Sequence, residues 1–454
     1  MKIQVPTHVE YIINTLMEHD YEAFAVGGCV RDTILEREPG DWDITTSAKP
    51  EEVKALFRRT IDTGIEHGTV TIMLDKVGYE VTTYRIDGEY EDNRHPKNVE
   101  FTSDLIEDLK RRDFTINAMA YNHNDGIVDA FQGLEDIKNK VIRCVGNARD
   151  RFDEDALRIM RAVRFAAQLG FTIDEETRKA IEEKAQHLKN ISAERIRVEL
   201  VKLITSAHPE LLITASELGI TKQFLPEFDR MLATPQTNPH HIYNVGRHSI
   251  EAVKAIRKVT KDLELDDKMI TILCLTMLLH DVAKPLTRTI DETGRDHFHG
   301  HQDEGVLIVK DILKRLKFDN MTIDMVSELV KFHDERIEPS AREVRRATSR
   351  IGLSLMPYLF YVQRCDVYAQ NPETWNEKFA ILDQIETLYL ELVEKKHCVQ
   401  LKDLAVTGKD LIQIGYKPGK VIGEVLSQLL EEVLEYPERN EKEYLLEVAR
   451  EKLL

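Results

Sequence analysis

Two aspartates separated by a single residue, Asp41 and Asp43, are the first side chains in this sequence that could do chemistry. Residues 44–46 favour a strand, in which alternation would place both carboxylates on one face and Trp42 on the other. Adjacent carboxylates repel each other unless a cation joins them, and Mg²⁺ binds one or two carboxylates together with substrate phosphates. The spacing therefore predicts a catalytic Mg²⁺ site at Asp41 and Asp43.

A pair of glycines, Gly27 and Gly28, lies just upstream of these acids. The apolar run 23–26 predicts a buried strand that ends at the glycines, and residues 29–35 can then begin a helix. Glycines let the backbone approach a ligand closely, and the amides of a helix N-terminus attract phosphate groups. Together they predict a triphosphate-binding turn, although the glycine pair or the acidic pair alone would more often be an ordinary turn or strand end.

Two further segments carry arginines beside acids. Residues 109–118 offer charges for phosphate and hydrogen-bonding groups for ribose, unless they form only a helix cap with a salt bridge. In residues 151–164 the last three arginines are three positions apart, which predicts a basic ridge on one helix face or a surface lattice of ion pairs. The side chains of interest are Arg112, Asp113 and Asn117 in the first segment and Glu154, Asp155, Arg158, Arg161 and Arg164 in the second.

The segment Gly27-Gly28-x-Val30-Arg31-Asp32, followed by the acidic pair, resembles the signature of polymerase-β-like nucleotidyltransferases and is similar to that of class II tRNA nucleotidyltransferases. The resemblance covers residues 20 to about 205 and resumes more weakly at 404–423. It implies template-independent addition or repair of the 3′-terminal CCA of tRNA from CTP and ATP, with two Mg²⁺ ions on the catalytic Asp41 and Asp43. The nucleotide-binding residues that it implies are Gly28, Arg31, Arg112, Asp113, Asn117, Asp155, Arg158, Arg161 and Arg164.

Asp155 and Arg158 match the base-selecting motif of this family. Cytosine and adenine each present an amino donor beside a ring-nitrogen acceptor, whereas guanine and uracil present a carbonyl acceptor beside an N–H donor. An ionised aspartate only accepts and an arginine only donates, so this pair would fit C and A. Three residues apart on one helix, the two would share a face, unless they merely pair with each other. Residues 194–200 resemble a further family motif and are expected to support that helix.

Half of the 16 histidines fall within residues 240–333. Imidazole and carboxylate ligands from several helices are what a catalytic divalent-metal site needs, although a single pair such as His280-Asp281 would more often cap a helix. The ordered set resembles the HD phosphohydrolases, which implies a divalent transition metal whose identity the sequence leaves open. The implied ligands are His248, His280, Asp281 and Asp366, with His301 and His333 for a second metal or the phosphate.

The pattern of elements predicts an α+β protein, in which a mixed-sheet, polymerase-β-like nucleotidyltransferase head precedes all-α neck, HD and tail domains. We place the head at 1–140, the RNA- and nucleotide-binding neck at 141–235, the HD domain at 236–370 and the helical tail at 371–454. The charged, aperiodic segment 85–97 is similar to the family's flexible loop. We expect it to order around the nucleotide and to be needed for the switch to A.

Composition bounds these expectations. The 454 residues are too many for a single core, and the five cysteines lack a Cys-x-x-Cys, which favours a reducing cytoplasm over disulfides or a thiolate zinc site. No apolar run of roughly 18 residues occurs, so we expect neither export nor membrane insertion. The net charge of −18 does not exclude tRNA, because residues 143–202 carry 13 Lys and Arg against 11 Asp and Glu.

Other functions stay open at this point. The same motifs occur in a specialist that adds only the terminal A, so that function stays open. CC-adding specialists lack a loop like residues 85–97, which speaks against that function here. Bacterial poly(A) polymerases usually lack the HD insert, which makes that function less favoured. The HD domain could also be the main enzyme behind a degenerate RNA-binding head, or the chain a non-catalytic metal-dependent scaffold. The intact acidic pair and base-selecting motif favour an active head, and a scaffold would not need the arginine ridge. The sequence leaves the oligomeric state open.

Overall fold

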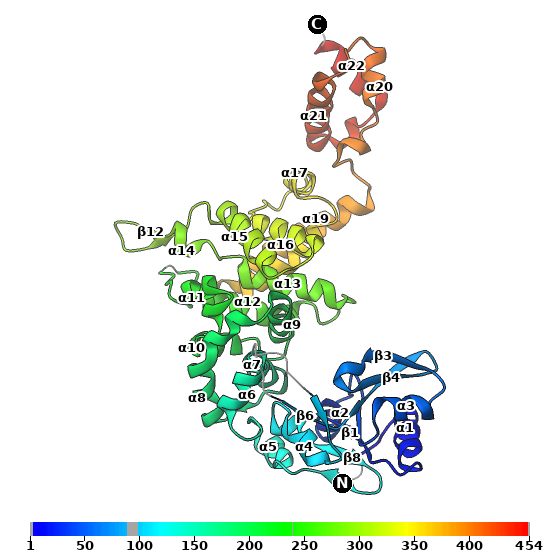
Figure 1. Ribbon diagram of the computed structural model, residues 1–454. Helices are drawn as coiled ribbons and strands as arrows, with labels where there is room; N and C mark the ends of the chain where they lie inside the picture. The colour runs from blue at the N-terminus through cyan, green and yellow to red at the C-terminus, as the bar shows by residue number, and fades with distance from the viewer. Residues whose placement is uncertain (1–2, 89–98, 238, 453–454) are drawn as a thin grey trace. The chain divides into compact units, whose positions relative to one another are not determined.

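A computed structural model describes residues 3–88, 99–237 and 239–452 (Figure 1). Contacts within the chain divide it into two compact units. Unit 1 comprises residues 1–229 with 315–317, and unit 2 comprises residues 230–314 with 318–454. The predicted head and neck therefore fall largely in unit 1 and the predicted HD and tail regions in unit 2, while the boundaries at 140 and 370 stay predictions.

Unit 1 is built on a mixed seven-stranded sheet with the order β3-β4-β5-β2-β1-β8-β9 (Figure 1). Neighbouring strands are antiparallel except for β2 and β5, which confirms the mixed sheet of the predicted fold class. All four side chains of β1 are buried, as the apolar run predicts. The strands are β1 (Ala23–Val26), β2 (Asp43–Thr46), β3 (Thr60–Gly64), β4 (Thr69–Leu74), β5 (Val77–Thr83), β8 (Ala120–Asn122) and β9 (Gly126–Val128).

The predicted turn and helix follow β1. Gly27 has φ of +81°, a conformation that glycine adopts readily, and α2 (Gly28–Ile34) begins directly after it. The strand β2, however, begins at Asp43 and its pairing with β1 ends there. The prediction that Asp41 lies on this strand is therefore wrong, because Asp41 belongs to the irregular segment before it, and the prediction that the two carboxylates share a face stays a prediction. Helices α1 (Thr7–Met17) and α3 (Pro50–Leu56) complete this part of the head.

The predicted loop 85–97 begins as a strand rather than as irregular chain. Arg85–Asp87 forms β6 and pairs with β7 (Val99–Phe101). The rest of the predicted loop, from residue 89, lies outside the described residues.

The predicted helix over 151–164 is interrupted at Asp155. Helix α6 (Ala148–Glu154) ends before this residue, and α7 (Leu157–Leu169) begins after it. Asp155 has extended dihedrals, and its side chain accepts a hydrogen bond from the backbone N–H of Leu157 at 3.0 Å. Aspartate caps helices in this way, so the prediction that Asp155 and Arg158 lie on one helix is wrong.

Helix α7 packs against α9 (Ala193–Ile204). The other helices of unit 1 are α4 (Leu105–Lys110), α5 (Gly133–Asn139), α8 (Glu175–Lys184), α10 (Leu211–Glu217) and α11 (Pro226–Leu232), which extends into unit 2. Unit 1 also contains two short strands, β10 (Val141–Ile142) and β11 (Thr172–Ile173), which pair with each other in parallel.

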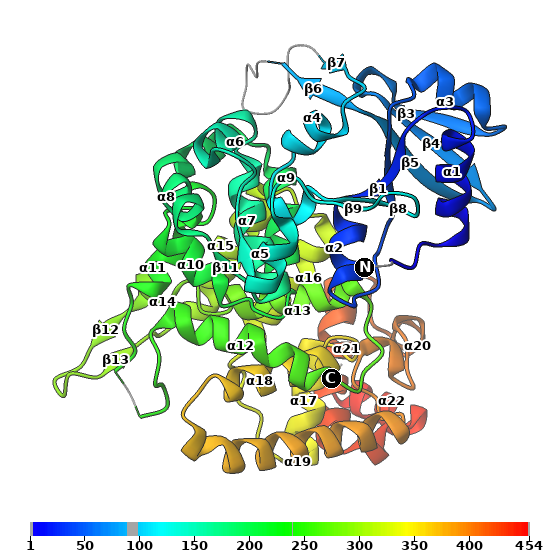
Figure 2. The same ribbon diagram turned by 90° about the horizontal axis from the view of Figure 1, so that it is seen from below.

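Unit 2 is helical around a fully buried segment, residues 272–279 of α13 (Asp267–Leu279). Helices α12 (Val245–Val259), α16 (Asn320–Phe332) and α18 (Met356–Tyr368) pack against α13 (Figure 2). The remaining elements here are α14 (Lys284–Thr287), β12 (Thr289–Ile290), β13 (Asp296–His297), α15 (His301–Arg315), α17 (Ala341–Ile351) and α19 (Trp375–Glu394). The stretch Asp267–Thr287 is long and apolar enough to cross a membrane, but 72% of its most apolar window is buried within the protein, as in a core helix.

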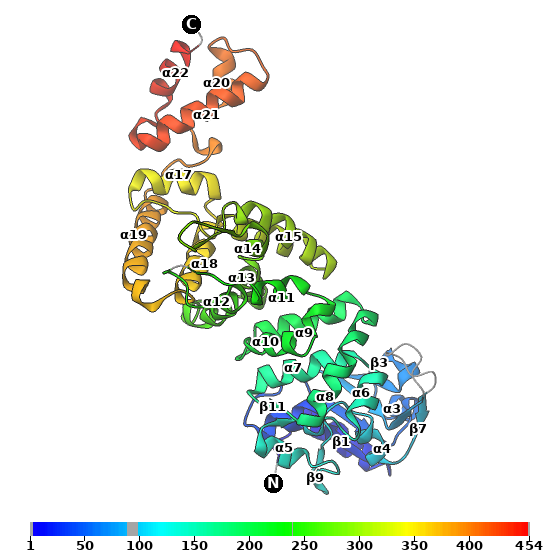
Figure 3. The same cartoon turned by 90° about the vertical axis from the view of Figure 1, so that its left-hand side faces the viewer.

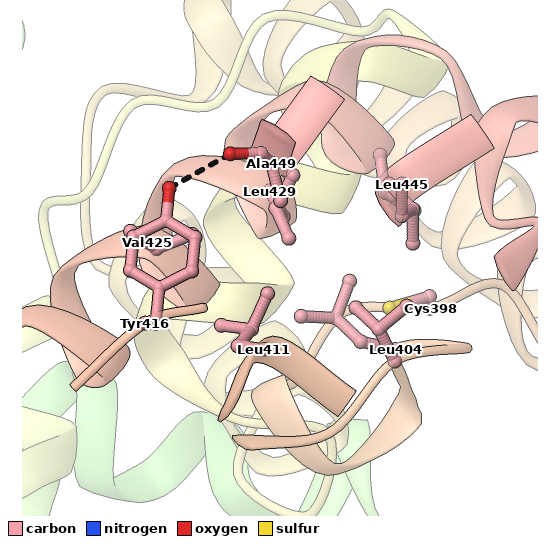
Figure 4. Packing of buried hydrophobic residues seen from close by; sticks show 10 residues of the cluster. Cys398, Leu404, Leu411, Tyr416, Val425, Leu429, Leu445 and Ala449 are labelled. Atoms are coloured by element: carbon pink, nitrogen blue, oxygen red, sulfur yellow. Dashed lines mark hydrogen bonds between the residues drawn. The ribbon is translucent and has the colours of Figure 1, made fainter. Parts of the chain in front are cut away.

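The C-terminal helices α20 (Gly408–Gln413), α21 (Lys420–Glu435) and α22 (Lys442–Glu451) enclose a small apolar core of their own. Figure 4 shows this core, in which the hydroxyl of Tyr416 donates a 2.8 Å hydrogen bond to the carbonyl of Ala449. Helix α17 lies next to α21 (Figure 3). Arg345 of α17 is buried and donates to the last carbonyls of α21, which ties the two helices together.

Candidate functional site

The acidic pair lies at the end of the sheet where β1 turns into α2. Asp43 begins β2 opposite Val26, and its backbone carbonyl accepts a weak hydrogen bond from the Cys29 thiol at 4.0 Å. Partial burial and the neighbouring charge of Asp41 raise the pKa of Asp43, while Arg112 opposes the shift. A raised carboxyl pKa beside a second carboxylate is the electrostatic condition that a divalent cation relieves.

The glycine turn faces Arg112. A Cβ placed on Gly27 would lie 3.0 Å from Nη1 of Arg112, so the guanidinium comes close to the turn, and the φ of +81° at Gly27 independently favours glycine. Arg112 also lies 3.6 Å from the buried carboxylate of Asp108, and its Nε is buried with no hydrogen-bond partner among the described residues. An unsatisfied buried donor beside a glycine turn and an acidic pair fits an anionic ligand such as a triphosphate.

A hydrogen-bonded chain links the predicted nucleotide-binding residues of α2, the segment after α4, and α7. Arg31 donates to Oδ1 of Asn117 at 2.5 Å, and Asn117 donates to Oδ1 of Asp113 at 3.0 Å. Arg161 then donates to Oδ2 of Asp113 through Nε and lies 2.7 Å from it through Nη2 as well. Burial opposes ionisation of Asp113, but the charge of Arg161 outweighs it and holds the pKa of Asp113 well below its usual value. These hydrogen bonds therefore join side chains from three separate segments of the chain into one network.

Each member of the predicted base-selecting pair is held by a group outside the pair. Both oxygens of Asp155 face Arg195 of α9, with Oδ1 at 3.3 Å from Nη1 and Oδ2 at 2.7 Å from Nη2. Arg158 donates to the Glu154 carboxylate and, at 2.9 Å, to the backbone carbonyl of Arg111. Asp155 and Arg158 therefore have separate partners, and the expected support by residues 194–200 is provided by Arg195.

The predicted arginine ridge is not an exposed basic surface. Arg164 is 6% exposed, donates to Glu199 of α9 at 2.8 Å and packs over the ring of Phe165 at 3.6 Å. Arg158 and Arg161 likewise have carboxylate partners. These contacts make Arg164 a link between α7 and α9, and its contact with a triphosphate stays a prediction.

Six residues of unit 2 converge on one buried point, and we call them the histidine centre: His248, His280, Asp281, His301, His333 and Asp366. They come from five places in the helical unit. His248 lies in the first turn of α12, His301 begins α15 and Asp366 belongs to α18. His280 and Asp281 follow the end of α13, and His333 follows the end of α16.

The four histidines share one orientation. Each pairs Nδ1 with a backbone carbonyl, as His248 does with Ala369 at 3.2 Å, His280 with Met277 at 2.8 Å, His301 with Phe298 at 2.7 Å and His333 with Val330 at 2.7 Å. An Nδ1–H that donates to a carbonyl leaves the Nε2 lone pair for a metal, which is the usual arrangement of metal-binding histidines. The Nε2 atoms meet in two pairs, His248 with His280 at 3.2 Å and His301 with His333 at 3.3 Å.

Asp281 stands between the two histidine pairs. Its Oδ2 lies 3.1 Å from Nε2 of His280, and its Oδ1 lies 3.4 Å from Nε2 of His301. The side chain is 1% exposed, and neither oxygen accepts a hydrogen bond of good geometry from the described residues. Asp366 completes the first pair, with Oδ1 at 2.8 Å from Nε2 of His248. The donor set thus fits a divalent cation, which His248, His280 and Asp281, or Asp281, His301 and His333, would hold.

Electrostatics in the histidine centre also favour a cation. Burial disfavours a charged His280, but Asp281 and Asp366 outweigh it and raise the pKa of His280 to about 10. The same negative charges would favour a divalent cation beside the two Nε2 atoms.

The histidine centre opens into a cavity of about 610 Å³. Asp281, His301, His333 and Asp366 line it together with apolar side chains of α18 and α19 and with Ile337 and Pro339. Sequence reasoning missed several polar residues of this cavity. Among them are Lys284, Gln370 and Lys378. Spacing could have suggested two of them, because Lys284 follows Asp281 by three residues and Gln370 follows Asp366 by four within or beside helices.

Three family patterns match the chain. The family described as "Poly A polymerase head domain" matches residues 23–143, and the one described as "Probable RNA and SrmB- binding site of polymerase A" matches residues 170–232. The family described as "tRNA nucleotidyltransferase domain 2 putative" matches residues 306–449.

Relatives match over nearly the whole length. The CCA-adding enzyme of Levilactobacillus brevis is 35% identical over 435 residues, which cover 96% of this chain and 95% of the relative. The CCA-adding enzyme of Limosilactobacillus reuteri is 36% identical over 447 residues, which cover 97% of this chain and 95% of the relative.

Solved structures of such enzymes match as well. The CCA-adding enzyme of Bacillus stearothermophilus in complex with CTP has a TM-score of 0.71 at 30% identity, over 99% of both chains. The Thermotoga maritima CCA-adding enzyme complexed with tRNA has a TM-score of 0.60 at 22% identity over the full length of both chains, and at that identity it shows a likeness of fold alone.

Proposed function

Since this chain belongs to the CCA-adding enzymes, a family of tRNA nucleotidyltransferases, we propose that unit 1 carries the active site that adds CCA to tRNA. The reaction is template-independent, and its substrates are CTP, ATP and the 3′ end of a tRNA. The names of the full-length relatives favour complete CCA addition over a specialist for the terminal A. We place the enzyme in the cytoplasm, where these substrates occur.

The observation that carries this proposal is the raised pKa of Asp43 beside Asp41, at the glycine turn that faces Arg112. The two carboxylates would hold Mg²⁺, which when bound supplies charge for the primer 3′-hydroxyl and the pyrophosphate leaving group. Arg112 would bind the triphosphate through Nη1, the guanidinium atom that lies beside the glycine turn. The amides at the start of α2 face the same turn and would bind phosphate oxygens.

The network behind the turn would orient the nucleotide. Arg31, Asn117, Asp113 and Arg161 fix one another, so substrate binding needs little further ordering of these side chains. Asp155 and Arg158 would read the base, since one accepts from the amino group of C or A and the other donates to the ring nitrogen. The carbonyl of Arg111 connects the reading arginine to the segment of Arg112.

Incubation of the purified protein with tRNAs that end before CCA, after C and after CC tests the proposal. CTP and ATP are supplied separately and together. We expect the first tRNA to gain C with CTP alone, and the CC-ended tRNA to gain A with ATP alone. Extension of only the CC-ended tRNA would replace this function with terminal-A addition, and no extension of any tRNA would contradict an active head.

We propose a second activity, metal-dependent phosphohydrolysis, for unit 2. Its support is the pair of histidine groups bridged by Asp281, with every Nε2 directed at the centre. The first group would hold one divalent transition metal, with Asp366 as its fourth ligand, and His301 with His333 would hold a second metal or the substrate phosphate. Bound metal would supply an activated water and polarise the phosphate.

The chain's own residues give this site a phosphate-binding character. Lys284 lies 2.7 Å from Oδ2 of Asp281, and Arg336 and Lys378 line the same cavity. Candidate substrates are 2′,3′-cyclic phosphates and nucleotide monoesters, assayed with Mn²⁺, Ni²⁺, Co²⁺ and Mg²⁺. If none is hydrolysed with any of these metals, the histidine centre is a structural remnant.

A further inference from the structure

We propose that helix α19 forms part of the ligand site in unit 2, where Ile381, Leu382 and Ile385 bind the organic group of a phosphoester. The ligands of this site would be phosphate esters whose organic group is apolar. The proposal rests on the proposed phosphohydrolysis and adds the kind of substrate that the site selects. Its basis is the set of side chains that line the cavity of about 610 Å³ at the histidine centre.

One face of α19 lines this cavity. The lining residues of the helix are Lys378, Ile381, Leu382 and Ile385, which stand at positions i, i+3, i+4 and i+7. Side chains at this spacing lie on the same face of a helix. A ligand in the cavity would therefore meet a lysine and three aliphatic side chains along about 10 Å of helix, at the usual rise per residue.

The lysine of this face is connected to the histidine centre. Lys378 donates to the amide oxygen of Gln370, and the amide nitrogen of Gln370 donates to Oδ2 of Asp366 at 2.7 Å. Ile381 and Leu382 follow Lys378 by about one helical turn. The histidine centre and the aliphatic side chains of α19 are therefore neighbours in one cavity.

The aliphatic side chains are available to a ligand. Ile381 is 38% exposed, and Leu382 and Ile385, which are 8% and 3% exposed, also line the cavity. Val367 of α18 and Ile337 add further aliphatic surface to it. Cavities of about 300–1,000 Å³ that combine apolar side chains with a few polar groups are typical of small-molecule sites.

The charged residues define the other part of the ligand. Lys284, Arg336 and Lys378 line the cavity, and a divalent cation held at Asp281 would add positive charge. These charges fit a phosphate. An inorganic polyphosphate or a sugar phosphate would satisfy them but leave the aliphatic side chains in water. A phosphoester with an apolar organic group fits both parts, because it also removes that surface from water.

Acids line the cavity outside the histidine centre as well. Glu335 pairs with Arg350, and Asp334 accepts a hydrogen bond from Gln302 at 3.3 Å. Glu338 is exposed to solvent, where salt screens its charge. The charges of these acids are thus partly balanced before a ligand binds.

A series of alkylphosphonates tests the proposal without any turnover, because their carbon–phosphorus bond takes the place of the ester bond. Calorimetric titration of the full-length protein compares methyl-, butyl- and hexylphosphonate, both with Mn²⁺ and after treatment with a chelator. We expect the affinity to rise about three- to fourfold for each methylene that the cavity covers. This increment should be the same with and without metal, since the aliphatic side chains of α19 cause it.

Phenylphosphonate identifies the source of the apolar group. It has as many carbon atoms as hexylphosphonate, but they form a flat ring like that of a nucleobase. Tighter binding of either compound than of methylphosphonate supports the apolar subsite. The tighter of the two shows whether the subsite prefers a ring or a flexible chain.

Ile381→Ser tests the subsite itself. It should lower the affinity for hexylphosphonate about tenfold and leave the affinity for methylphosphonate at the wild-type value. Ile106→Ser is the matched control, because Ile106 of α4 in unit 1 is also 38% exposed and does not line the cavity. This control should bind both compounds like the wild type.

Two results would overturn the subsite. One is equal affinity of the wild type for all three alkylphosphonates, or no binding of any of them, and the other is an unchanged dependence on chain length in Ile381→Ser. A protein that shows the dependence but hydrolyses no phosphoester would keep the subsite and overturn only the proposed phosphohydrolysis.

Discussion

Nε2 of His248 lies 3.2 Å from Nε2 of His280, while Nδ1 of each ring is already engaged by a backbone carbonyl. Two imidazole acceptors at this distance need a positive charge between them. The buried acids Asp281 and Asp366 provide the balancing negative charge. The two histidines and the two acids together have the composition of a cation-binding site in the core of unit 2.

Metal should therefore stabilise the folded protein. We expect added Mn²⁺ to raise the thermal midpoint of the chelator-treated wild type, since a ligand at about 100 times its Kd contributes about 2.7 kcal/mol. His280→Ala should abolish the increase. His208→Ala removes a histidine that pairs with Glu210 outside the histidine centre, and it should respond like the wild type. Equal midpoints with and without metal in the wild type would contradict a bound cation.

The two proposed activities should separate by mutation. Replacing His280 and Asp281 together by Ala should remove metal-dependent phosphohydrolysis, because both belong to the histidine centre in unit 2, while tRNA extension continues. Asp41→Ala should have the opposite effect. Both activities are measured on the same preparations, and loss of both in either variant would mean that the sites depend on each other.

The acidic pair should be essential for addition. Asp41→Ala and Asp43→Ala should each abolish nucleotide incorporation, since each removes a carboxylate that would hold Mg²⁺. Gel analysis of labelled tRNA measures the loss. Appreciable incorporation by either variant would contradict the assignment.

The proximity of Asp41 and Asp43 predicts that the free energy of unfolding depends on pH. Burial and Asp41 raise the pKa of Asp43, so the folded state binds more protons than the unfolded state, and this carboxylate costs stability once the pH rises above the usual carboxyl pKa. Without metal, Asp43→Asn should melt above the wild type at pH 7. The two should converge below about pH 4, where both side chains are neutral. A constant difference across this range would mean that ionisation of Asp43 is not the cause.

Base selection should depend on Asp155 directly. Asp155→Ala should weaken the use of CTP and ATP together and narrow their advantage over UTP and GTP about 10- to 100-fold, by analogy with bidentate reading of base edges. The measurement is kcat/KM for all four nucleotides on C-ended and CC-ended tRNAs. If this variant prefers CTP and ATP over UTP and GTP as strongly as the wild type does, residues other than Asp155 select the base.

The contact between α7 and α9 should matter for folding. Arg164 and Glu199 are 6% and 4% exposed and lie 2.8 Å apart, so Glu199→Ala leaves a buried charge without its partner. We expect a loss of about 3–5 kcal/mol in urea unfolding. Glu183→Ala, which breaks an exposed pair with Arg149, should change the urea midpoint much less than Glu199→Ala does.

The sequence by itself determined the features that depend on local chemistry. The apolar run 23–26 and Gly27 predict β1 and its turn because burial and positive φ are properties of a few adjacent residues. The members of the histidine centre were implied by the resemblance of the ordered histidines and acids to the HD phosphohydrolases, and the structure brings the same six side chains together.

Only the tertiary structure decided which groups hold these residues in place. The break at Asp155 arises because its side chain caps α7, a competition between helix and cap that periodicity does not reveal. Its partner, Arg195, lies 40 residues away on α9, and Asp281 bridges histidines from four helical segments. Such pairings follow from how helices pack, because side chains meet across helix interfaces whose geometry depends on the whole core rather than on sequence spacing.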